Sequence, residues 1–169
     1  MSIDNFLIEY RDIENKSIRE LLRLLNETEG RKLSELKVLD LSYHNGNPIW
    51  PGEGVYIFRN GKRAVYVGKV SSMSFTERIA RHFDVRSFAW MNRLLKLISE
   101  RELKHEKQNH ENLKIASKYA FENLNIVLIN FSNRDRINRT ERLLRSCTQP
   151  LNKFKKLTQK NLDKIVKEY

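Results

Sequence analysis

The stretch GVYIFRNGKRAVYVGKV, residues 54–70, constrains the fold more than any other part of this 169-residue chain. Two short apolar runs, each with a tyrosine, flank Asn60-Gly61. Asn-Gly between apolar runs is the strongest short-range signal for a β-hairpin, because both residues tolerate the positive φ of a tight turn. The sequence therefore predicts two antiparallel strands here, whose aromatic residues suit a pleated, partly buried surface.

The bulk composition indicates what the chain binds. The formal net charge is +11, and hydrophobic residues make up 40% of the chain, enough for a core of ordinary size. So basic a surface favours polyanions. Nucleic acid is expected ahead of membrane, because no apolar run approaches the roughly 20 residues of a spanning helix.

The cysteine and histidine content points to a reducing, cytoplasmic setting. Cys147 is the single cysteine, so an internal disulfide is excluded. Four histidines and one cysteine without paired spacing do not make a structural zinc motif. The N-terminus has early acidic charges and no apolar segment of the kind that a signal peptide carries. We therefore expect a cytoplasmic protein.

Helical periodicity and turn residues divide the chain before the hairpin. Residues 5–29 are predicted to be helical, because the apolar residues of SIRELLRLL recur at helical spacing. Residues 30–42 fit either a second helix or a passage from helix to strand. Asn, Gly and Pro mark residues 43–54 as a loop.

A capping box marks the first helix after the hairpin. Ser74 and Glu77 form the S-x-x-E pattern, which predicts a helix start near Ser74. A second helix is predicted over 87–104. The side chains expected to face the core from these two helices are Phe75, Ile79, Phe83, Trp90, Leu94, Leu97 and Ile98.

The remaining elements complete an α+β pattern. A helix is predicted over 112–124, and the β-branched run 125–131 predicts a strand. A basic loop over 132–138 and a helix over 139–147 follow, the latter with Leu143, Leu144 and Cys147 on one side. A basic helix is predicted at the C-terminus. The order of elements indicates an α+β domain on a small sheet.

An ordered set of residues around the hairpin resembles the GIY-YIG nuclease family. The triplets GVY at 54–56 and YVG at 66–68 are followed by a helix with Arg78 and His82, then by Glu141, then by PLN at 150–152. The resemblance covers about residues 52–155 and implies a three-stranded antiparallel sheet flanked by helices. It also implies a magnesium-dependent endonuclease, as found in restriction, homing and excision repair.

The resemblance implies roles for individual residues. The catalytic set that it implies is Tyr56, Tyr66, Lys69, Arg78, His82 and Glu141. Glu141 would hold Mg²⁺ or Mn²⁺, and Gly68 and Asn152 would contact or approach the substrate. Basic charge beside this set adds Arg81 and Arg139 as phosphate contacts.

These residue types suit phosphodiester hydrolysis. Magnesium prefers hard oxygen ligands and keeps several waters, so Glu141 with phosphate oxygens would suffice to hold it. The guanidinium fork of Arg78 suits a scissile phosphate. Arg78 and His82 lie at i and i+4, on one helix face.

The general base has two candidates, Tyr56 and His82. A phenol titrates near 10, so a tyrosinate at pH 7 costs about 4 kcal/mol, which Lys69, Arg78 and the metal would offset. We favour Tyr56 as the base, with Tyr66 positioning water or phosphate. His82 competes, because an imidazole needs no large pKa shift.

Shared catalysis by the two tyrosines requires an irregular hairpin. With a two-residue turn on Asn60-Gly61, Tyr56 lies opposite Val65, and the two tyrosines then point to opposite faces. We predict a bulge, or a three-residue loop with Gly61 in the left-handed conformation, that brings them to one face.

Other interpretations remain open. Asn138 and Glu141 also fit an N-x-x-E cap, in which Glu141 only stabilises a helix start. The chain would otherwise be a catalytically idle nucleic-acid binding protein on the same fold, a repair or mobile-element nuclease, or a basic adaptor for an acidic protein. The set Tyr56, Tyr66, Arg78 and Glu141 favours the nuclease.

The expected organisation is a helical or irregular extension over 1–50, a GIY-YIG-like nuclease domain over 51–155, and a basic helix or tail over 156–169. We expect a restriction-type enzyme that acts on DNA, with a homodimer for double-strand cleavage. Sequence recognition is expected from 88–123 or from the N-terminal segment. The basic residues expected to contact the DNA backbone are Arg134, Arg136, Arg139, Lys153, Lys155, Lys156, Lys160, Lys164 and Lys167.

Overall fold

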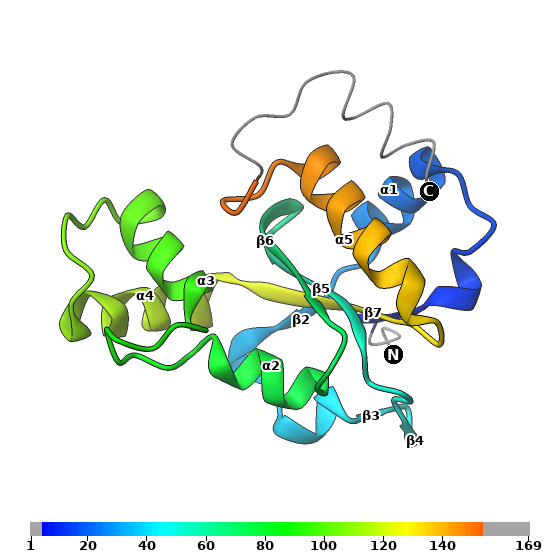
Figure 1. The fold of residues 1–169 in the computed structure, drawn as a ribbon, viewed down its shortest axis with the longest axis horizontal. Helices are drawn as coiled ribbons and strands as arrows, with labels where there is room; N and C mark the ends of the chain where they lie inside the picture. Colours follow the sequence, from blue (N-terminus) through cyan, green and yellow to red (C-terminus); the bar gives the residue numbers. More distant parts are fainter. Residues whose placement is uncertain (1–4, 154–169) are drawn as a thin grey trace.

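One mixed β-sheet organises the protein, whose computed structural model describes residues 5–153. Its strands lie in the order β1-β7-β5-β6, and β2 also pairs with β7 (Figure 1). The strand bounds are β1 Leu7–Glu9, β2 Arg31–Lys32, β5 Gly54–Asn60, β6 Arg63–Val70 and β7 Asn125–Asn130. A separate small ribbon joins β3, Tyr43–His44, to β4, Asn47–Pro48.

The sheet differs from the expected one in size and direction. The antiparallel strands β7, β5 and β6 are present, but β1 pairs parallel with β7, and β2 pairs antiparallel with it. The fold is therefore α+β, and the three antiparallel strands lie within a mixed five-stranded sheet that is larger than the expected one. Residues before the hairpin supply the two additional strands.

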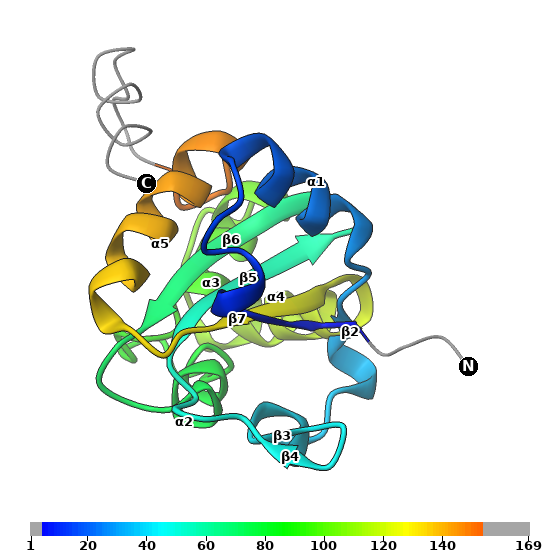
Figure 2. The ribbon, with the colours of Figure 1, turned by 90° about the vertical axis from the view of Figure 1, so that its right-hand side faces the viewer.

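Helices cover both faces of the sheet (Figures 1 and 2). One face packs against α1, Ile18–Glu27, and α5, Arg134–Thr148. The other face packs against α2, Phe75–Arg81, α3, Arg93–Leu97, and α4, His110–Asn123, with a π-helical turn over Ile98–Glu102. Alternation along the strands separates two cores, so that Tyr56 and Phe58 face the second group of helices and Val55 and Ile57 face the first.

The hairpin has the predicted irregularity. Asn60 pairs with Arg63 across a two-residue turn on Gly61-Lys62, and Gly61 is left-handed at φ +57°. The register then shifts between Phe58 and Arg59, so that Phe58 pairs with Tyr66. The bulge is confirmed, although the turn lies one residue later than Asn60-Gly61.

The bulge determines which side chains of β6 face α2. Val65 and Tyr66 are consecutive, yet both belong to the core that contains Tyr56. Ala64 and Val67, on either side of them, belong to the opposite core. Tyr56 and Tyr66 therefore lie on one face, with stacked rings 6.2 Å apart.

The N-terminal prediction is wrong for the residues before α1. Leu7–Glu9 forms a strand on the outer side of β7, and Tyr10–Asp12 is a 3₁₀ turn. A capping box, in which Ser17 and Glu20 bond reciprocally, sets the start of α1. Pairing with β7 satisfies the backbone groups of this segment, which outweighs its helical pattern. Two further 3₁₀ turns, Leu33–Glu35 and Val38–Leu41, lie in the ambiguous region.

The later helices follow the predictions with three corrections. The Ser74 capping box is confirmed, and Leu94 and Ile98 are buried as predicted. Trp90 is 82% exposed rather than inward, because the helix starts at Arg93. The predicted loop 132–138 is largely helical, since Asn133 caps α5. Cys147 is exposed.

One finding and one prediction depend on which residues the structure describes. Within residues 5–153, no helix combines the length and apolar character needed to cross a bilayer. The predicted basic tail 156–169, with Lys155, lies outside the described residues.

Candidate active site

A cavity of about 410 Å³ lies at the open edge of the sheet, beside the C-terminal half of β6. Elements from both faces reach this edge: α2 contributes Arg78, and α5 contributes Glu141 and Arg145. The lining includes six of the ten predicted site residues: Tyr66, Gly68, Lys69, Arg78, Glu141 and Asn152.

Alternation along β6 explains how one strand serves both sides of the cavity. Tyr66 belongs to the face covered by α2, whereas Lys69 reaches the opposite face, where its Nζ donates to Asn138 of α5. Asn138 and Glu141 are three residues apart on α5, so both lie on the same side of that helix. The edge strand thus places groups from the two faces around one opening.

Tyr56 lies behind the cavity and explains the glycine at position 68. Tyr56 pairs with Gly68 across the hairpin, and its side chain is fully buried. A Cβ on Gly68 would lie 2.2 Å from the Cζ and the Oη of Tyr56, closer than packed atoms approach. Gly68 is therefore required for the packing of Tyr56, independently of any contact with substrate.

A buried hydrogen-bond chain links Tyr56 to α2 and α3. The backbone N–H of Leu94 donates to Nδ1 of His82 at 3.4 Å, so we assign the imidazole proton to Nε2. The Nε2–H group of His82 donates to the hydroxyl of Tyr56 at 2.6 Å, and Nε of Arg78 donates to the same oxygen at 3.1 Å. The Tyr56 oxygen thus accepts two hydrogen bonds.

Neither expected general base reaches the cavity. Tyr56 and His82 are fully buried, and neither lines the opening. Burial raises the pKa of Tyr56, and burial reinforced by Arg78 lowers the pKa of His82 to about 3. The structure thus places both expected bases in the interior, with His82 as a neutral imidazole near pH 7, and joins them to Arg78 through the hydroxyl of Tyr56.

Arg78 is held by this chain and faces the cavity. Its Nε is engaged by Tyr56, and in the described part of the protein its Nη atoms make no hydrogen bond. A guanidinium fixed at Nε presents its remaining donors in a defined direction, which suits a phosphate oxygen.

Tyr66 is the tyrosine that lines the cavity. Its side chain is 5% exposed, and its hydroxyl has no hydrogen-bond partner among residues 5–153. Burial raises the pKa of this hydroxyl, against the opposing effect of three arginines, Arg78, Arg93 and Arg145. Tyr66 thus remains a neutral phenol surrounded by cationic groups.

Glu141 is the carboxylate of the cavity. It lies in the middle of α5, seven residues after Arg134, where that helix starts, so the alternative reading as an N-terminal cap is wrong. Its Oε1 forms an ion pair of 3.1 Å with Arg145, one helical turn further along, and both side chains are largely buried. The carboxylate is thereby held at the opening.

Asn152 covers the edge strand. Its side-chain oxygen accepts from the backbone N–H of Val67 at 3.2 Å, and its side-chain nitrogen donates to the carbonyl of Val67 at 2.6 Å. Both polar groups of the amide are therefore bonded to β6, and they pair the backbone N–H and carbonyl that Val67 would otherwise leave open at the sheet edge. Asn152 therefore lines the cavity with a side-chain amide that is already bonded to β6.

The donor set of the cavity allows one carboxylate ligand for a metal. In residues 5–153, no three His, Cys, Asp or Glu side chains are close enough together to bind a metal ion. Magnesium needs few protein carboxylates when substrate oxygens and waters complete its shell. The residues thus fit a metal that arrives with a phosphate, and Glu141 is the residue that would hold it.

Two arginines that line the cavity, Arg93 and Arg145, were not among the predicted site residues. Two predicted site residues, Arg81 and Arg139, do not line it. Arg145 follows Glu141 by four residues on a helix, a spacing that predicts an ion pair. Arg93 carries no comparable signal. Arg81 lines a neighbouring hollow, where its Nη1 donates to the sulfur of Met91, and Arg139 does not line the cavity.

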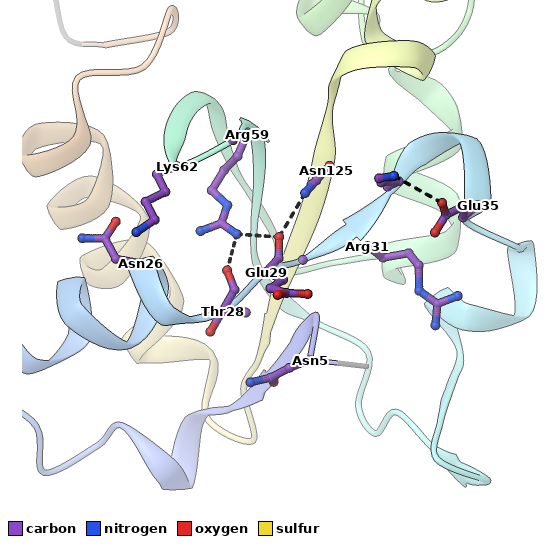
Figure 3. A pocket seen from close by; sticks show the side chains of 12 residues that line it. Asn5, Asn26, Thr28, Glu29, Arg31, Glu35, Arg59, Lys62 and Asn125 are labelled. Atoms are coloured by element: carbon purple, nitrogen blue, oxygen red, sulfur yellow. Dashed lines mark hydrogen bonds and ion pairs between the residues drawn. The ribbon is translucent and has the colours of Figure 1, made fainter. Parts of the chain in front are cut away.

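A larger cavity of about 630 Å³ lies at the turn end of the hairpin and has a structural explanation (Figure 3). Arg59 is buried there, and its guanidinium donates to the carbonyls of Leu25, Thr28 and Glu29. These carbonyls belong to the C-terminal end of α1 and the residues after it, where positive charge is favoured. Arg59 therefore joins β5 to α1.

Comparison with protein-family models, with curated proteins and with solved structures gives no match to this chain.

Proposed function

We propose that the edge cavity binds and hydrolyses a phosphodiester of DNA, and that the protein is a Mg²⁺-dependent endonuclease. The observation that carries the proposal is the convergence of Tyr66, Lys69, Arg78 and Glu141, from three separate elements, on one opening. These are residues that the resemblance to the GIY-YIG nucleases implies. Strands β7, β5 and β6 would correspond to that family's three-stranded sheet.

The charges of the cavity favour an anionic substrate. Four cationic side chains, those of Lys69, Arg78, Arg93 and Arg145, line the opening with the single carboxylate of Glu141. A phosphate there would be neutralised by guanidinium groups, which bind phosphate oxygens in pairs. The net charge of +11 supports the approach of a polyanion as long as DNA.

Each residue has a definable part in the reaction. Arg78, oriented by Tyr56 and His82, would contact the scissile phosphate and stabilise the charge that develops on it. The Tyr66 hydroxyl would orient the attacking water through a hydrogen bond, and the proton that this water loses would pass to a phosphate oxygen and from there to the leaving oxygen. A metal held by Glu141 and the phosphate would supply further charge neutralisation and stabilise the leaving oxygen.

The proposed enzyme is a restriction-type endonuclease. Cleavage of both strands would then need a dimer or two successive events, because the described residues contain one such cavity. A repair or mobile-element nuclease would use the same cavity on a different target.

The test is cleavage of plasmid and genomic DNA by the purified protein, with Mg²⁺ and with EDTA. Glu141→Gln is the principal variant, and Glu122→Gln, at an exposed position on α4, is the matched control. We expect discrete fragments with Mg²⁺, which EDTA and Glu141→Gln abolish and Glu122→Gln leaves unchanged. Nicking or smearing with the same dependence would retain the nuclease and reject the restriction type.

A second candidate is a nucleic-acid binding protein without hydrolysis. The excess of cations and the ion pair between Glu141 and Arg145 favour it, since both support anion binding without a metal. Salt-sensitive DNA binding that is equal in the unaltered protein and in Glu141→Gln, with no cleavage in any metal, would establish this candidate.

A further inference from the structure

Two large aromatic side chains are exposed beside the edge cavity. Phe88 and Trp90, in the connection between α2 and α3, are 79% and 82% exposed. Trp90 lines the edge cavity and also a hollow of about 290 Å³ beside it, which Phe88 shares. Exposed aromatic groups of this size next to a binding site indicate a contact surface.

The connection that carries them is held in place by its own hydrogen bonds. The fully buried side chain of Asn92 donates to the carbonyls of Asp84 and Arg86, at 2.6 and 3.0 Å. Nζ of Lys96 donates to the carbonyl of Ala89 at 2.6 Å. The aromatic groups are therefore presented by an ordered backbone, which lowers the entropy lost when a partner binds.

The surroundings of these aromatics are cationic. Arg86 lies over the ring of Phe88, 5.4 Å from its centroid, and Arg81 lines the same hollow. The acidic group there, Asp84, forms an ion pair with Arg86. A partner that offers both a flat ring and a phosphate matches this surface, whereas an apolar partner would leave the arginines unmatched.

We propose that Trp90, with Phe88, stacks on an unpaired DNA base next to the phosphate held in the edge cavity. The inference rests on the proposed function and specifies its preferred substrate: DNA in which a base near the scissile bond is already free of its partner. In fully paired DNA, such as a restriction site, that base must first be unpaired and unstacked, which costs free energy. Such a base offers a ring face to an aromatic side chain, whereas the faces of bases inside a duplex are covered by their neighbours.

The first test uses tryptophan fluorescence in EDTA, where cleavage is excluded. The chain has two tryptophans, so Trp50→Phe leaves Trp90 as the single reporter. This variant is titrated with a single-stranded oligonucleotide, with a duplex that has one central unpaired base, and with the fully paired duplex. We expect saturable quenching with the first two and little with the third.

The second test compares affinities under the same conditions. Trp90→Ala should weaken binding to the duplex with the unpaired base by about tenfold, which corresponds to about 1.4 kcal/mol and lies within the range for one stacked base. Phe88→Ala should weaken it less, because Phe88 does not line the edge cavity. Trp50→Ala removes an equally exposed tryptophan, 83% exposed, from outside that cavity and should leave the affinity unchanged.

The outcomes separate this inference from the function on which it rests. DNA binding without quenching, or an equal effect of Trp90→Ala and Trp50→Ala, overturns the stacking and leaves the nuclease proposal intact. Quenching and loss of affinity as expected, without Mg²⁺-dependent cleavage, sustain the stacking and overturn the hydrolysis. Failure of the unaltered protein to bind any of the three DNAs overturns both.

Discussion

The hydroxyl of Tyr56 and Nε2 of His82 lie 2.6 Å apart in the protein interior, in a hydrogen bond that also determines how Arg78 is held. The Tyr56 oxygen accepts from both residues, so the tyrosine connects a buried imidazole to a guanidinium that faces the cavity. The tyrosine and the histidine thus hold Arg78 from the interior, whereas Tyr66 and Arg78 line the cavity.

This relationship predicts that substitutions of the two tyrosines affect different properties, stability for Tyr56 and cleavage for Tyr66. Tyr56→Phe leaves the buried N–H of His82 and Nε of Arg78 without their acceptor, which should lower the free energy of unfolding by about 1–3 kcal/mol. Tyr66→Phe removes a hydroxyl with no partner in the described chain, so the unfolding free energy should change by less than about 0.5 kcal/mol, while cleavage falls. Urea unfolding and cleavage assays on both variants measure these effects. A larger loss of stability in Tyr66→Phe would contradict the assignment.

The buried His82 predicts acid sensitivity. Its pKa in the folded protein is about 3 and its ordinary value is 6.5, so between these values the unfolded chain binds a proton that the folded chain does not. Stability should therefore fall as the pH is lowered below about 6.5, by about 1.4 kcal/mol per pH unit from this group in the middle of the range. In His82→Gln this contribution should be absent.

Urea unfolding between pH 4.5 and 7.5 measures this pH dependence. His110→Gln, at an exposed position, is the matched control and should keep the slope of the unaltered protein. Parallel stability profiles for the unaltered protein and His82→Gln would show that His82 does not cause the acid sensitivity.

The contact between Gly68 and Tyr56 predicts a strongly destabilising alanine. Gly68→Ala places a Cβ 2.2 Å from the ring, and the rigid aromatic must move, at a cost of about 1–3 kcal/mol or more. In a Tyr56→Leu background the same change should cost much less, because the colliding atoms are gone. Gly46→Ala is a useful comparison, since it meets no atom and tests only the left-handed backbone at φ +79°. Equal effects of Gly68→Ala in both backgrounds would reject the steric explanation.

The arginines of the cavity predict a specific salt dependence. If Arg93 neutralises a DNA phosphate, Arg93→Ala should reduce the slope of log affinity against log salt by about 0.9. Arg19→Ala removes an exposed cation from α1, which does not line the cavity, and should leave the slope unchanged. Fluorescence anisotropy with a labelled duplex in EDTA gives both slopes. The same decrease for both variants would indicate a diffuse electrostatic effect instead of a phosphate contact.

Much of the local structure could be predicted from short-range patterns. Asn60-Gly61 between apolar runs predicted the hairpin, and Ser74 with Glu77 predicted the start of α2, because turns and caps depend on neighbouring residues. Leu7–Glu9 could not be predicted in the same way. Its conformation depends on pairing with β7, which is more than a hundred residues away in the chain.

The candidate site was predictable as a set of residues but not as an arrangement. The pattern identified Tyr66, Arg78 and Glu141, yet it did not separate them from Tyr56 and His82, which belong to the same implied set but lie in the interior. Exposure decides between these roles, and exposure depends on which helices pack on each face. Arg93 was missed because its position beside the cavity also depends on how the helices pack on the sheet.

By itself, the sequence determined the hairpin, the start of α2, and the chemical types available for a phosphate site. Alternation along strands and hydrogen bonds between near neighbours determine those features. Only the tertiary structure decided that Tyr56 and His82 are buried and hydrogen-bonded behind Arg78, and that α5 brings Glu141 to the edge of β6. These roles follow from packing across both faces of the sheet, which joins residues that no local pattern connects.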